Sequence, residues 1–540
     1  MTEDIVDFLV IGSGPSGAAA TWSLADTGTR IMCMEQGDWM KQADYPSNFR
    51  DWEIRQGRAD LKNTNFSFSP NARNLKADYP INDDESAVQP FMYNAVGGTT
   101  VSFSAIYPRF HPSDFRTKSL DGVADDWPID YQQLEEYYNL NDRINGVSGL
   151  EGDPAYPSKK PPLPPLPNGE AGNVIAKGFN KLGWHWWPAD RAIISQPYEG
   201  RDKCINLGTC NSGCTQGAKS TPDVTYWPLA LRKKGVELKT NCRVREITIN
   251  NGGMADGVIY YDEEGRENRQ KAEVVILACN AVGTPRLLLN SSASQFPDGL
   301  ANHSGLVGKN LMVHPWGVVR GYFDEGLDFS RGPTMNGISC HEFSETNPKH
   351  DFVRGYTFSI LKQEGRPMNS ALGLGKEIPW GSEHHEMFRK HFGNCIMTDI
   401  LCEDLPEACN QVTLDQELKD SNGIPAPKIT YRYSENSKRM MTHALARGRE
   451  LMEAAGAWKI KSDGLVRGSG WHLMGTARMG KDPSSSVVNE WGRSHDVRNL
   501  FIVDGSIFVT SSACNPTNTL QSLSLYIADN IKKNITNLFD

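Results

Sequence analysis

The sequence predicts an α/β fold with a doubly wound, Rossmann-like domain that binds a dinucleotide. The chain opens with a strand, a glycine-rich turn and a helix, and strand–helix pairs return near residues 273–289 and 500–531. With 540 residues the chain is too long for one simple core, so we expect two or three domains.

The first 35 residues have the pattern of a βαβ unit. Strands are predicted at residues 7–11 and 30–35, and a helix at 18–24. The turn Gly12–Gly17 reads G-x-G-x-x-G: Gly12 permits the tight turn, Gly14 lets the backbone approach a pyrophosphate, and Gly17 allows close helix–strand packing. The helix N-terminus offers N–H groups to phosphates, and Glu35 can accept hydrogen bonds from a ribose.

Later segments complete the expected domain. Strands are predicted at residues 236–238, 243–249, 256–262 and 273–278, and a helix at 284–289. Near the end, a strand over 500–503 leads into Asp504 and Gly505, and Asn515-Pro516-Thr517 opens a helix expected over 519–531. The N-terminus of such a helix can stabilise the negative charge that a reduced flavin carries around N1 and O2, which favours FAD over NAD.

Composition narrows the function classes. A net charge of −9 argues against nucleic acids and anionic membrane surfaces as partners, because both attract positive charge. No apolar run approaches the roughly 20 residues that span a bilayer, and the N-terminus lacks the basic segment of a signal peptide. We therefore expect a cytoplasmic protein, with export alongside a partner subunit left open. The proline-rich run 161–167 predicts a stiff, extended connector.

A series of motifs along nearly the whole chain resembles those of the glucose–methanol–choline (GMC) oxidoreductases. They are the glycine fingerprint, Asn94 to Thr100, Asp126 to Tyr131 with Leu134, Tyr137 and Tyr138, Ala278 to Leu288, Val307 to Leu311 with His314 and Pro315, and His472 to Gly480. The last one, H-x-x-G-x-x-R-M-G, is similar to the sugar-oxidising branch, with its pyranose oxidases and gluconate dehydrogenases. Cys279 and Asn280 depart from the small residues that are usual there.

The resemblance implies FAD and a substrate domain built on an antiparallel sheet. In pyranose oxidases a histidine of the second glycine-rich segment bonds covalently to FAD; Ser102 stands at that position, so we expect non-covalent FAD. We expect an FAD-binding domain at residues 1–115, 200–309 and 466–540, linker or cover segments at 116–199, and a substrate domain at 310–465. The expected FAD contacts are Gly12, Ser13, Gly14, Pro15, Ser16, Gly17, Glu35, Gln36, Gly97, Gly98, Thr99, Val244, Ala278, Asp504, Gly505, Asn515, Pro516 and Thr517.

Oxidation of an alcohol needs a base for the O–H proton and a flavin N5 that takes the hydride. An imidazole suits the first task because its pKa lies near neutrality. The resemblance makes His472 this base and Asn515 its partner, which hydrogen-bonds the substrate oxygen; Asn515 could also be the N-cap of the last helix. His111, His314, His384, His385 and His495 have no comparable context, and we expect surface or core residues there.

Three of the eleven cysteines are bunched, at Cys204, Cys210 and Cys214. Three thiolates on a glycine-containing loop could hold a [3Fe-4S] cluster, and their spacing resembles that of dehydrogenase subunits of this family that pass electrons to a cytochrome. The alternative is a structural loop packed near the flavin. Zinc is disfavoured because no histidine follows at ligand spacing. Without a secretory signal, most of the cysteines should be free thiols.

The leading hypothesis is FAD-dependent oxidation of a CH–OH group of a sugar, glycoside or polyol to a carbonyl. Two alternatives stay open: a catalytic subunit of a membrane-associated dehydrogenase complex, with a small subunit or cytochrome as partner, and a non-redox, flavin-bearing lyase. The substrate is expected to be a small alcohol, and a homo-oligomer is compatible with the sequence. Trp186 and Trp187 could stack on sugar faces at the substrate entrance or fill an aromatic core.

Overall fold

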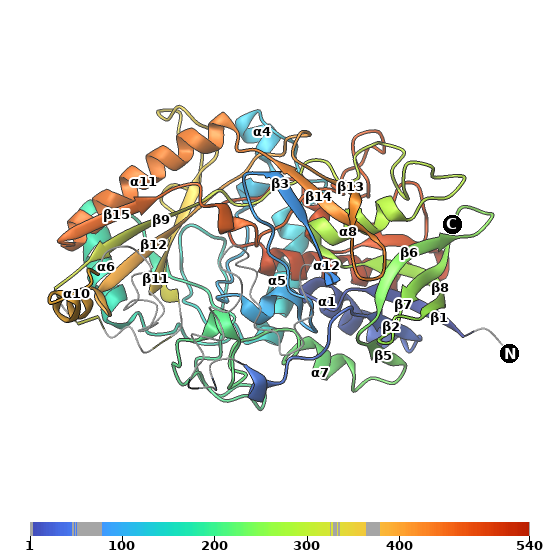
Figure 1. The fold of residues 1–540 in the computed structure, drawn as a ribbon, viewed down its shortest axis with the longest axis horizontal. Helices are drawn as coiled ribbons and strands as arrows, with labels where there is room; N and C mark the ends of the chain where they lie inside the picture. Colours follow the sequence, from blue (N-terminus) through green and yellow to red (C-terminus); the bar gives the residue numbers. More distant parts are fainter. Residues whose placement is uncertain are drawn as a thin grey trace.

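The computed structural model describes residues 4–45, 48, 50, 78–324, 326, 327, 332, 335–362 and 378–538. Its strands form a seven-stranded, a six-stranded and a three-stranded sheet. The seven-stranded sheet lies at the end of the molecule that carries both termini, and the six-stranded sheet lies at the opposite end (Figure 1). The middle of the molecule therefore lies between the two large sheets.

The seven-stranded sheet is the nucleotide-fold sheet, in the order β5-β2-β1-β8-β7-β6 with β16 also paired to β8. Its strands are β1 (Ile5–Ile11), β2 (Ile31–Met34), β5 (Val236–Lys239), β6 (Arg243–Ile249), β7 (Ala255–Tyr261), β8 (Glu267–Leu277) and β16 (Leu500–Ile502). Strands β5, β2, β1, β8 and β16 run parallel, while β6 and β7 are antiparallel additions. Residues of β1 on both faces are buried, as in a sheet covered on both sides.

The first and last helices of the chain pack together on this sheet. Helix α1 (Pro15–Leu24) starts with a proline, which suits the first turn because an N–H there would lack a helical partner. It packs against α12 (Thr517–Lys533) and α7 (Tyr226–Ala230), and α12 packs against α5 (Tyr131–Asn145). Gln521 and Ser524 of α12 hydrogen-bond to the Pro15 and Ser16 carbonyls, so both helices begin at the same edge of the sheet. Helix α8 (Asn280–Asn290) follows β8 there.

The six-stranded sheet is antiparallel throughout, in the order β15-β9-β12-β11-β10-β4. Its strands are β4 (Trp187–Pro188), β9 (Trp316–Tyr322), β10 (Met335–Cys340), β11 (Tyr356–Lys362), β12 (Cys395–Cys402) and β15 (Lys459–Asp463). One face carries Val319, Phe358 and Ile400 into a core with α6 (Gly169–Leu182) and α11 (Glu435–Ala455). The other face turns toward the middle of the molecule.

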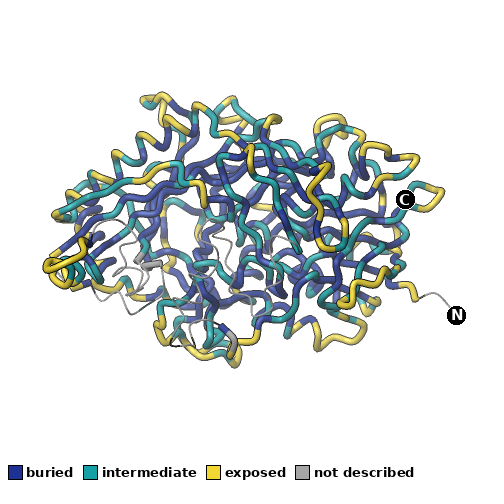
Figure 2. Tube along the Cα trace, in the orientation of Figure 1, coloured by how far each residue is buried: buried dark blue, intermediate teal, exposed yellow. Residues whose placement is uncertain are grey.

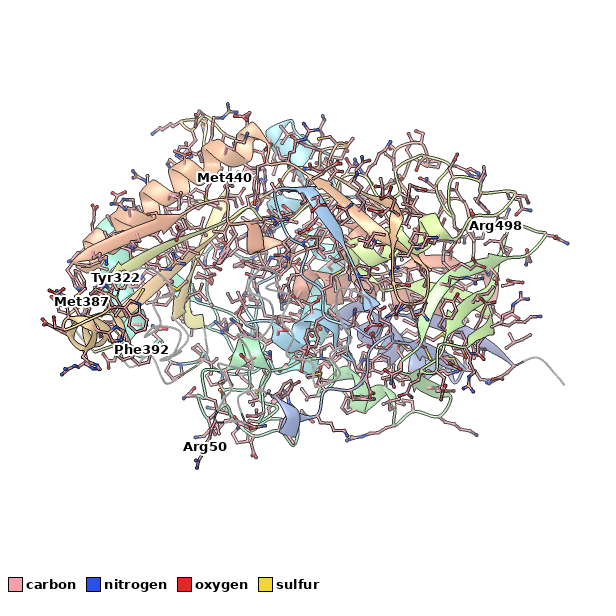
Figure 3. The ribbon with its side chains drawn as sticks, viewed as in Figure 1. Arg50, Tyr322, Met387, Phe392, Met440 and Arg498 are labelled. Atoms are coloured by element: carbon pink, nitrogen blue, oxygen red, sulfur yellow. The ribbon has the colours of Figure 1, made fainter. Side chains whose placement is uncertain are left out.

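Smaller elements surround this frame. The three-stranded sheet has the order β13-β14-β3, with β3 (Asn82–Ser86), β13 (Gln411–Lys419) and β14 (Pro425–Tyr431). Helix α4 (Thr117–Asp121) is short, and α10 (His384–His391) lies at the tip of the six-stranded sheet, where Figure 3 shows Tyr322, Met387 and Phe392 gathered. Figure 2 shows buried segments along the strands of both large sheets and exposed segments on the periphery.

The strands and helices expected from the pattern are confirmed, with boundaries shifted by a few residues. The largest shift is in β8, which begins at Glu267 rather than at residue 273 because its first half pairs with β7. The run 161–167 has no helix and no strand apart from one isolated bridge at Leu163, as its prolines predict. Within the described ranges, no helix is long and apolar enough to cross a membrane.

Candidate active site

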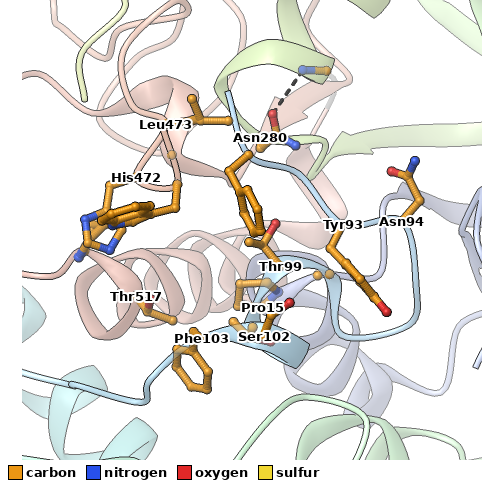
Figure 4. Close-up of a pocket in the computed structure, with 18 of the residues that line it drawn as sticks. Pro15, Tyr93, Asn94, Thr99, Ser102, Phe103, Asn280, His472, Leu473 and Thr517 are labelled. Carbon is orange, nitrogen blue, oxygen red and sulfur yellow. Dashed lines mark hydrogen bonds between the residues drawn. The ribbon is translucent and has the colours of Figure 1, made fainter. Parts of the chain in front are cut away.

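A cavity of about 1070 Å³ extends between the seven-stranded and the six-stranded sheet. Glu35, Gln36 and Val244 line it on the side of the seven-stranded sheet, and residues of β9 and β12 line it on the other side. In Figure 4, His472 stands on one side of this space, Thr99 and Ser102 lie in the middle, and Tyr93 and Asn94 lie on the far side. A long ligand can thus reach from β2 to the six-stranded sheet.

The glycine turn forms a wall of bare backbone. Gly12 has a φ of +100°, and a Cβ there would lie 2.4 Å from the Ala278 carbonyl oxygen. A Cβ on Gly17 would lie 1.9 Å from the Gly12 oxygen, whereas a Cβ on Gly14 would have Gly98 Cα as its nearest neighbour, at 3.9 Å. Gly12 and Gly17 therefore hold the turn together, and Gly14 keeps backbone open to the cavity beside the N-terminus of α1.

Glu35 is held rigidly at the end of β2. One carboxylate oxygen accepts the Ser13 N–H at 3.0 Å and the Ser13 hydroxyl at 2.7 Å, and the other accepts the Gly37 N–H at 2.9 Å. Burial raises the pKa of Glu35, and these hydrogen bonds oppose the rise by favouring the charged form. The remaining acceptor sites of this carboxylate are positioned to receive ribose hydroxyls.

Most of the predicted FAD contacts converge on the cavity. Those that line it are Gly12, Gly14, Pro15, Ser16, Glu35, Gln36, Gly98, Thr99, Val244, Ala278, Asp504, Gly505, Asn515, Pro516 and Thr517. Ser13, Gly17 and Gly97 do not line it: Ser13 holds Glu35, Gly17 packs on Gly12, and Gly97 packs on Asp223 and Val101. These three residues shape the wall from behind.

The residues present fit FAD. Two helix N-termini, from α1 and α12, open onto the cavity through Pro15 and Thr517, and both can face negatively charged groups. Ser102 also lines the cavity, and its buried hydroxyl has no hydrogen-bond partner within the described part of the chain. Such a group calls for a ligand or water to complete it.

Two histidines meet at the substrate side because of strand-like pairing between distant segments. Met312 and Met474 exchange backbone hydrogen bonds in an antiparallel bridge. In this antiparallel register, His314, two residues after Met312, lies opposite His472, two residues before Met474. Their Nδ1 atoms are 2.7 Å apart. His314 is buried, as expected for a core residue, but sequence reasoning missed that it directly contacts the predicted base.

The hydrogen-bond chain determines the tautomer of both rings. His314 Nε2 lies 2.8 Å from the Ser512 carbonyl oxygen, which can only accept, so His314 carries its proton on Nε2. Burial lowers the pKa of His314 to about 4, so its Nδ1 is a bare acceptor near neutral pH. His472 must then donate from Nδ1. Burial, and to a smaller extent the neighbouring His314, lowers the pKa of His472 well below its usual value. The ring is therefore neutral near neutral pH, and Nε2 keeps a lone pair.

Asn515 stands next to that lone pair. Its Nδ2 is 3.4 Å from His472 Nε2, and both residues line the cavity. The same loop supplies Ser512, whose φ of +57° and whose hydroxyl bond to Asp114 at 2.7 Å fix the carbonyl that holds His314. The alternative role of Asn515 as N-cap of α12 is wrong: Pro516 is the N-cap, with no side-chain capping bond. The Asn515 amide is thus available to a ligand.

The three bunched cysteines lie on a loop beside the cavity. Cys210 is buried, Cys204 and Cys214 are partly buried, and all eleven cysteines are free. Among the described residues, three potential metal-ligating atoms come within 4.8 Å of one another only at His111, His341 and Cys514, so the three cysteines form no such compact group.

Trp186 and Trp187 do not line the cavity, which favours the aromatic-core alternative over stacking at the substrate entrance. Trp187 belongs to edge strand β4, and Trp186 packs against the core between the six-stranded sheet, α6 and α11. The aromatic residues that do line the substrate side include Trp316 and Trp471, whose ring centroids are 4.9 Å apart. Sequence reasoning missed both, because neither belongs to the family motifs, although each lies directly beside one.

Comparison with known proteins agrees with this geometry. Two family models, both described as GMC oxidoreductase, match residues 6–316 and 406–524. The chain is 40% identical to 2-methyl-1,2-propanediol dehydrogenase of Mycolicibacterium austroafricanum, over 99% of this chain and 97% of that protein. It is 28% identical to the fructose dehydrogenase large subunit of Gluconobacter japonicus, over 97% of each chain. The crystal structure of pyridoxine 4-oxidase from Mesorbium loti has the same fold, with a TM-score of 0.67, 17% identity and coverage of 98% and 99%.

The family matches span most of the chain, and the relative at 40% identity covers nearly all of it. The glycine turn and the pair His472 and Asn515, all taken from the family motifs, line this one cavity. The chain belongs to the GMC oxidoreductase family, and it is an FAD-dependent oxidoreductase that acts on CH–OH groups.

Proposed function

We propose that the protein oxidises a CH–OH group of a small polyhydroxylated molecule, a sugar, glycoside or polyol, to a carbonyl. The observation that carries this proposal is the pair of His472 Nε2 and Asn515 Nδ2, 3.4 Å apart in the wall of the cavity. Bound FAD, held without a covalent bond, supplies the two-electron acceptor. The names of two relatives, a propanediol dehydrogenase and a fructose dehydrogenase, support a polyhydroxylated substrate.

Each residue of the pair has a distinct task. His472 Nε2 holds the lone pair that accepts the hydroxyl proton. The Asn515 amide donates a hydrogen bond to the same substrate oxygen and stabilises the negative charge that develops there. Once His472 is protonated, its Nδ1–H still points at His314 Nδ1, and the Ser512 carbonyl keeps His314 from turning. His314 is thus a positioning residue.

The domain division belongs to the same proposal. The segments 1–115, 200–309 and 466–540 contribute all seven strands of the nucleotide-fold sheet, which supports their assignment to FAD. The segment 310–465 contributes five strands of the six-stranded sheet, which supports its assignment to the substrate. Two short strands fall outside this scheme: β4 at residues 187–188 joins the six-stranded sheet, and β3 joins the three-stranded one.

Anaerobic mixing of the FAD-loaded protein with sugars, glycosides and polyols tests the proposal. We expect at least one of them to bleach the flavin absorbance without oxygen. A protein that stays yellow with every alcohol but cleaves an adduct of a carbonyl compound would instead be the non-redox lyase, and the proposal would fail.

A second candidate function adds an electron exit through a [3Fe-4S] cluster on Cys204, Cys210 and Cys214. The observation that favours it is buried positive charge around these thiols. Burial lowers the pKa of Lys219 to about 8, while Cys210 and Cys214 act in the opposite direction. Burial likewise lowers the pKa of Arg201 to about 10, and Cys214 acts in the opposite direction. At Cys204, burial raises the pKa of the thiol to about 11, and Arg191 acts in the opposite direction, as a cation beside a thiol should.

The cysteine loop is also tied to the predicted flavin wall. Lys219 Nζ donates to the carbonyl oxygens of Val101 at 2.8 Å, Phe103 at 3.0 Å and Cys210 at 2.6 Å. Val101 and Phe103 flank Ser102, so one ammonium group links the loop to the cavity. In this candidate a small subunit or cytochrome receives the electrons. Near the cysteines, the apolar side chains of Ile205 and Leu207 are 60% and 47% exposed, a surface that suits such a partner.

Metal analysis of protein purified without oxygen decides this candidate. A cluster predicts about three irons per chain with acid-labile sulfide, both lost in Cys210→Ser. Less than about one iron per chain, with alcohol oxidation intact, would leave a plain FAD enzyme with free thiols in this loop.

A further inference from the structure

Asp399 is a buried carboxyl group in the wall of the substrate side of the cavity. It lies in β12, opposite Val318 of β9 and Ser359 of β11. Met397 and Leu401, two residues away on either side, also line the cavity, so this face of β12 looks away from the helices. Asp399 is only 7% exposed, and its surroundings on the strand are apolar.

The protein leaves most of the hydrogen-bonding capacity of this carboxyl unused. The indole N–H of Trp316 donates to one oxygen, and within the described residues no second donor reaches the group. A carboxylate offers about four acceptor sites. Burial raises the pKa of Asp399 to about 7, and the bond from Trp316 opposes this only in part. The nearest strand cation on this face, Arg320, is paired with Asp463.

The other buried carboxyl groups at the cavity, Glu35 and Asp504, accept more hydrogen bonds from the chain. Glu35 has three hydrogen bonds from Ser13 and Gly37. Asp504 has a bond from the Thr284 hydroxyl at 2.6 Å and one from the Ser506 N–H at 2.8 Å. The chain itself thus supplies at least two donors to each of these carboxyl groups. Keeping a carboxyl buried with a single donor is costly, so a group of this kind that faces a cavity points to a ligand.

Asp399 is also connected to the reaction centre. The ring of its donor, Trp316, contacts Trp471 edge to face, with 4.9 Å between centroids. The rings of Trp471 and His472 also contact edge to face, with 6.2 Å between their centroids. Two indole rings therefore separate the carboxyl from the base, and a substrate whose oxidised carbon lies at His472 extends along them toward Asp399.

We infer that Asp399 binds a hydroxyl group of the substrate other than the one that is oxidised. The substrate hydroxyl donates to the carboxylate oxygen that Trp316 leaves open, and Asp399 thereby selects polyhydroxylated substrates over simple alcohols. This inference rests on the proposed oxidation of a polyol or sugar and adds which side chain recognises it. A site built to hydrogen-bond a hydroxyl rejects the analogue that lacks it, because the buried group is then left unpaired.

The test compares Asp399→Leu and Asp399→Asn with Thr398→Val. Thr398 is the neighbouring residue, fully buried on the opposite face of β12, and its hydroxyl has no partner within the described chain, so it is a matched deletion of one polar group. The substrates are hexitols, hexoses and methyl glycosides, each with its monodeoxy analogues, and 1-hexanol. Turnover is measured with a dye acceptor, and binding to the FAD-loaded protein by calorimetry.

We expect Asp399→Leu to lower kcat/KM for the best polyhydroxylated substrate roughly 10-fold to 100-fold, with a matching rise in Kd. The kcat/KM for 1-hexanol should stay within about 3-fold of wild type, and so should all values for Thr398→Val. The loss of kcat/KM in Asp399→Asn should lie between that in Asp399→Leu and that in Thr398→Val. Because a poorly satisfied carboxyl is removed, the melting temperature of Asp399→Leu should not fall. A purely structural Asp399 predicts the reverse, a lower melting temperature with unchanged discrimination.

An unchanged preference between a polyhydroxylated compound and its deoxy analogues in both Asp399 variants would overturn the inference. Tighter binding of an amino sugar than of the parent sugar, lost in the variants, would also overturn it, in favour of a cationic ligand. If wild type binds hydroxylated compounds selectively and no alcohol bleaches its flavin, the proposed function fails while the role of Asp399 in binding stands.

Discussion

The two ends of the cavity are built in different ways. At the nucleotide end the wall is bare backbone from residues close together in the sequence, Gly12 to Gly17, with Glu35 held by Ser13 and Gly37. At the substrate end the wall is made of side chains from segments that are far apart in the sequence, where His472 meets His314 and Asp399 meets Trp316. The first end depends on the absence of side chains and the second on their identity, so mutations should separate cofactor binding from chemistry.

The largest effect is expected at the substrate end, for His472→Ala. Removal of a general base costs roughly 10² to 10⁴ in kcat, and FAD content should stay at the wild-type level because the nucleotide end is untouched. Stopped-flow measurement of flavin bleaching checks both. The control is His495→Ala, since His495 bonds to Ser486 and does not line the cavity. A His472→Ala rate within a few-fold of wild type would remove His472 from the mechanism.

At the nucleotide end, Gly14→Ala and Gly17→Ala should behave differently. A methyl group on Gly14 enters open space toward the cavity, so it should weaken FAD binding about 10-fold or more without lowering the melting temperature of the apoprotein. A methyl group on Gly17 meets the Gly12 oxygen at 1.9 Å and should destabilise the fold itself, by about 1–3 kcal/mol. Equal losses of stability in both variants would contradict the different tasks of the two glycines.

A smaller effect is expected for His314→Phe, which keeps a ring and removes the acceptor for His472 Nδ1–H. Without it, His472 can place its proton on Nε2 and lose its function as base, so kcat should fall about 10-fold or more while KM and FAD content change little. Steady-state kinetics with a flavin spectrum gives all three quantities. An unchanged kcat would show that the tautomer is set by another group.

The smallest effect concerns pH. Because the pKa of His472 is lowered well below its usual value, the base stays unprotonated as the pH falls through 6.5, and it loses its lone pair only at lower pH. The kcat/KM for 1-hexanol, which does not need Asp399, should therefore change less than about 2-fold between pH 8 and pH 6.5. A fall with its midpoint at pH 6.5 or above would mean that His472 titrates as an unperturbed imidazole.

The nucleotide end was largely predictable from the sequence, since its determinants are local. A strand, a glycine turn and a helix in succession bring Gly14, Glu35 and the start of α1 together through hydrogen bonds between neighbours. The second helix N-terminus was predicted as well, but its cap was not: Pro516 rather than Asn515 stands at the N-cap, a detail of one backbone turn.

The substrate end was predictable only where a family motif covers it. His472 and Asn515, which line the cavity, were predicted in this way, whereas His314 was expected only to be a surface or core residue. Its role arises from the register of the bridge between Met312 and Met474, which no local pattern encodes. The same holds for Asp399 and Trp316, which are brought together by antiparallel pairing of β9 with β12.

The central claim is that His472 accepts the hydroxyl proton of a CH–OH group whose carbon gives up a hydride, so that two protons and two electrons leave the substrate in all. The most direct measurement is anaerobic flavin bleaching by the best polyhydroxylated substrate, with and without deuterium on the carbon that is oxidised. The account predicts bleaching by wild type, a slower rate with deuterium, and an oxidised flavin in His472→Ala. Bleaching by His472→Ala at the wild-type rate, or no bleaching of wild type by any alcohol, would contradict it.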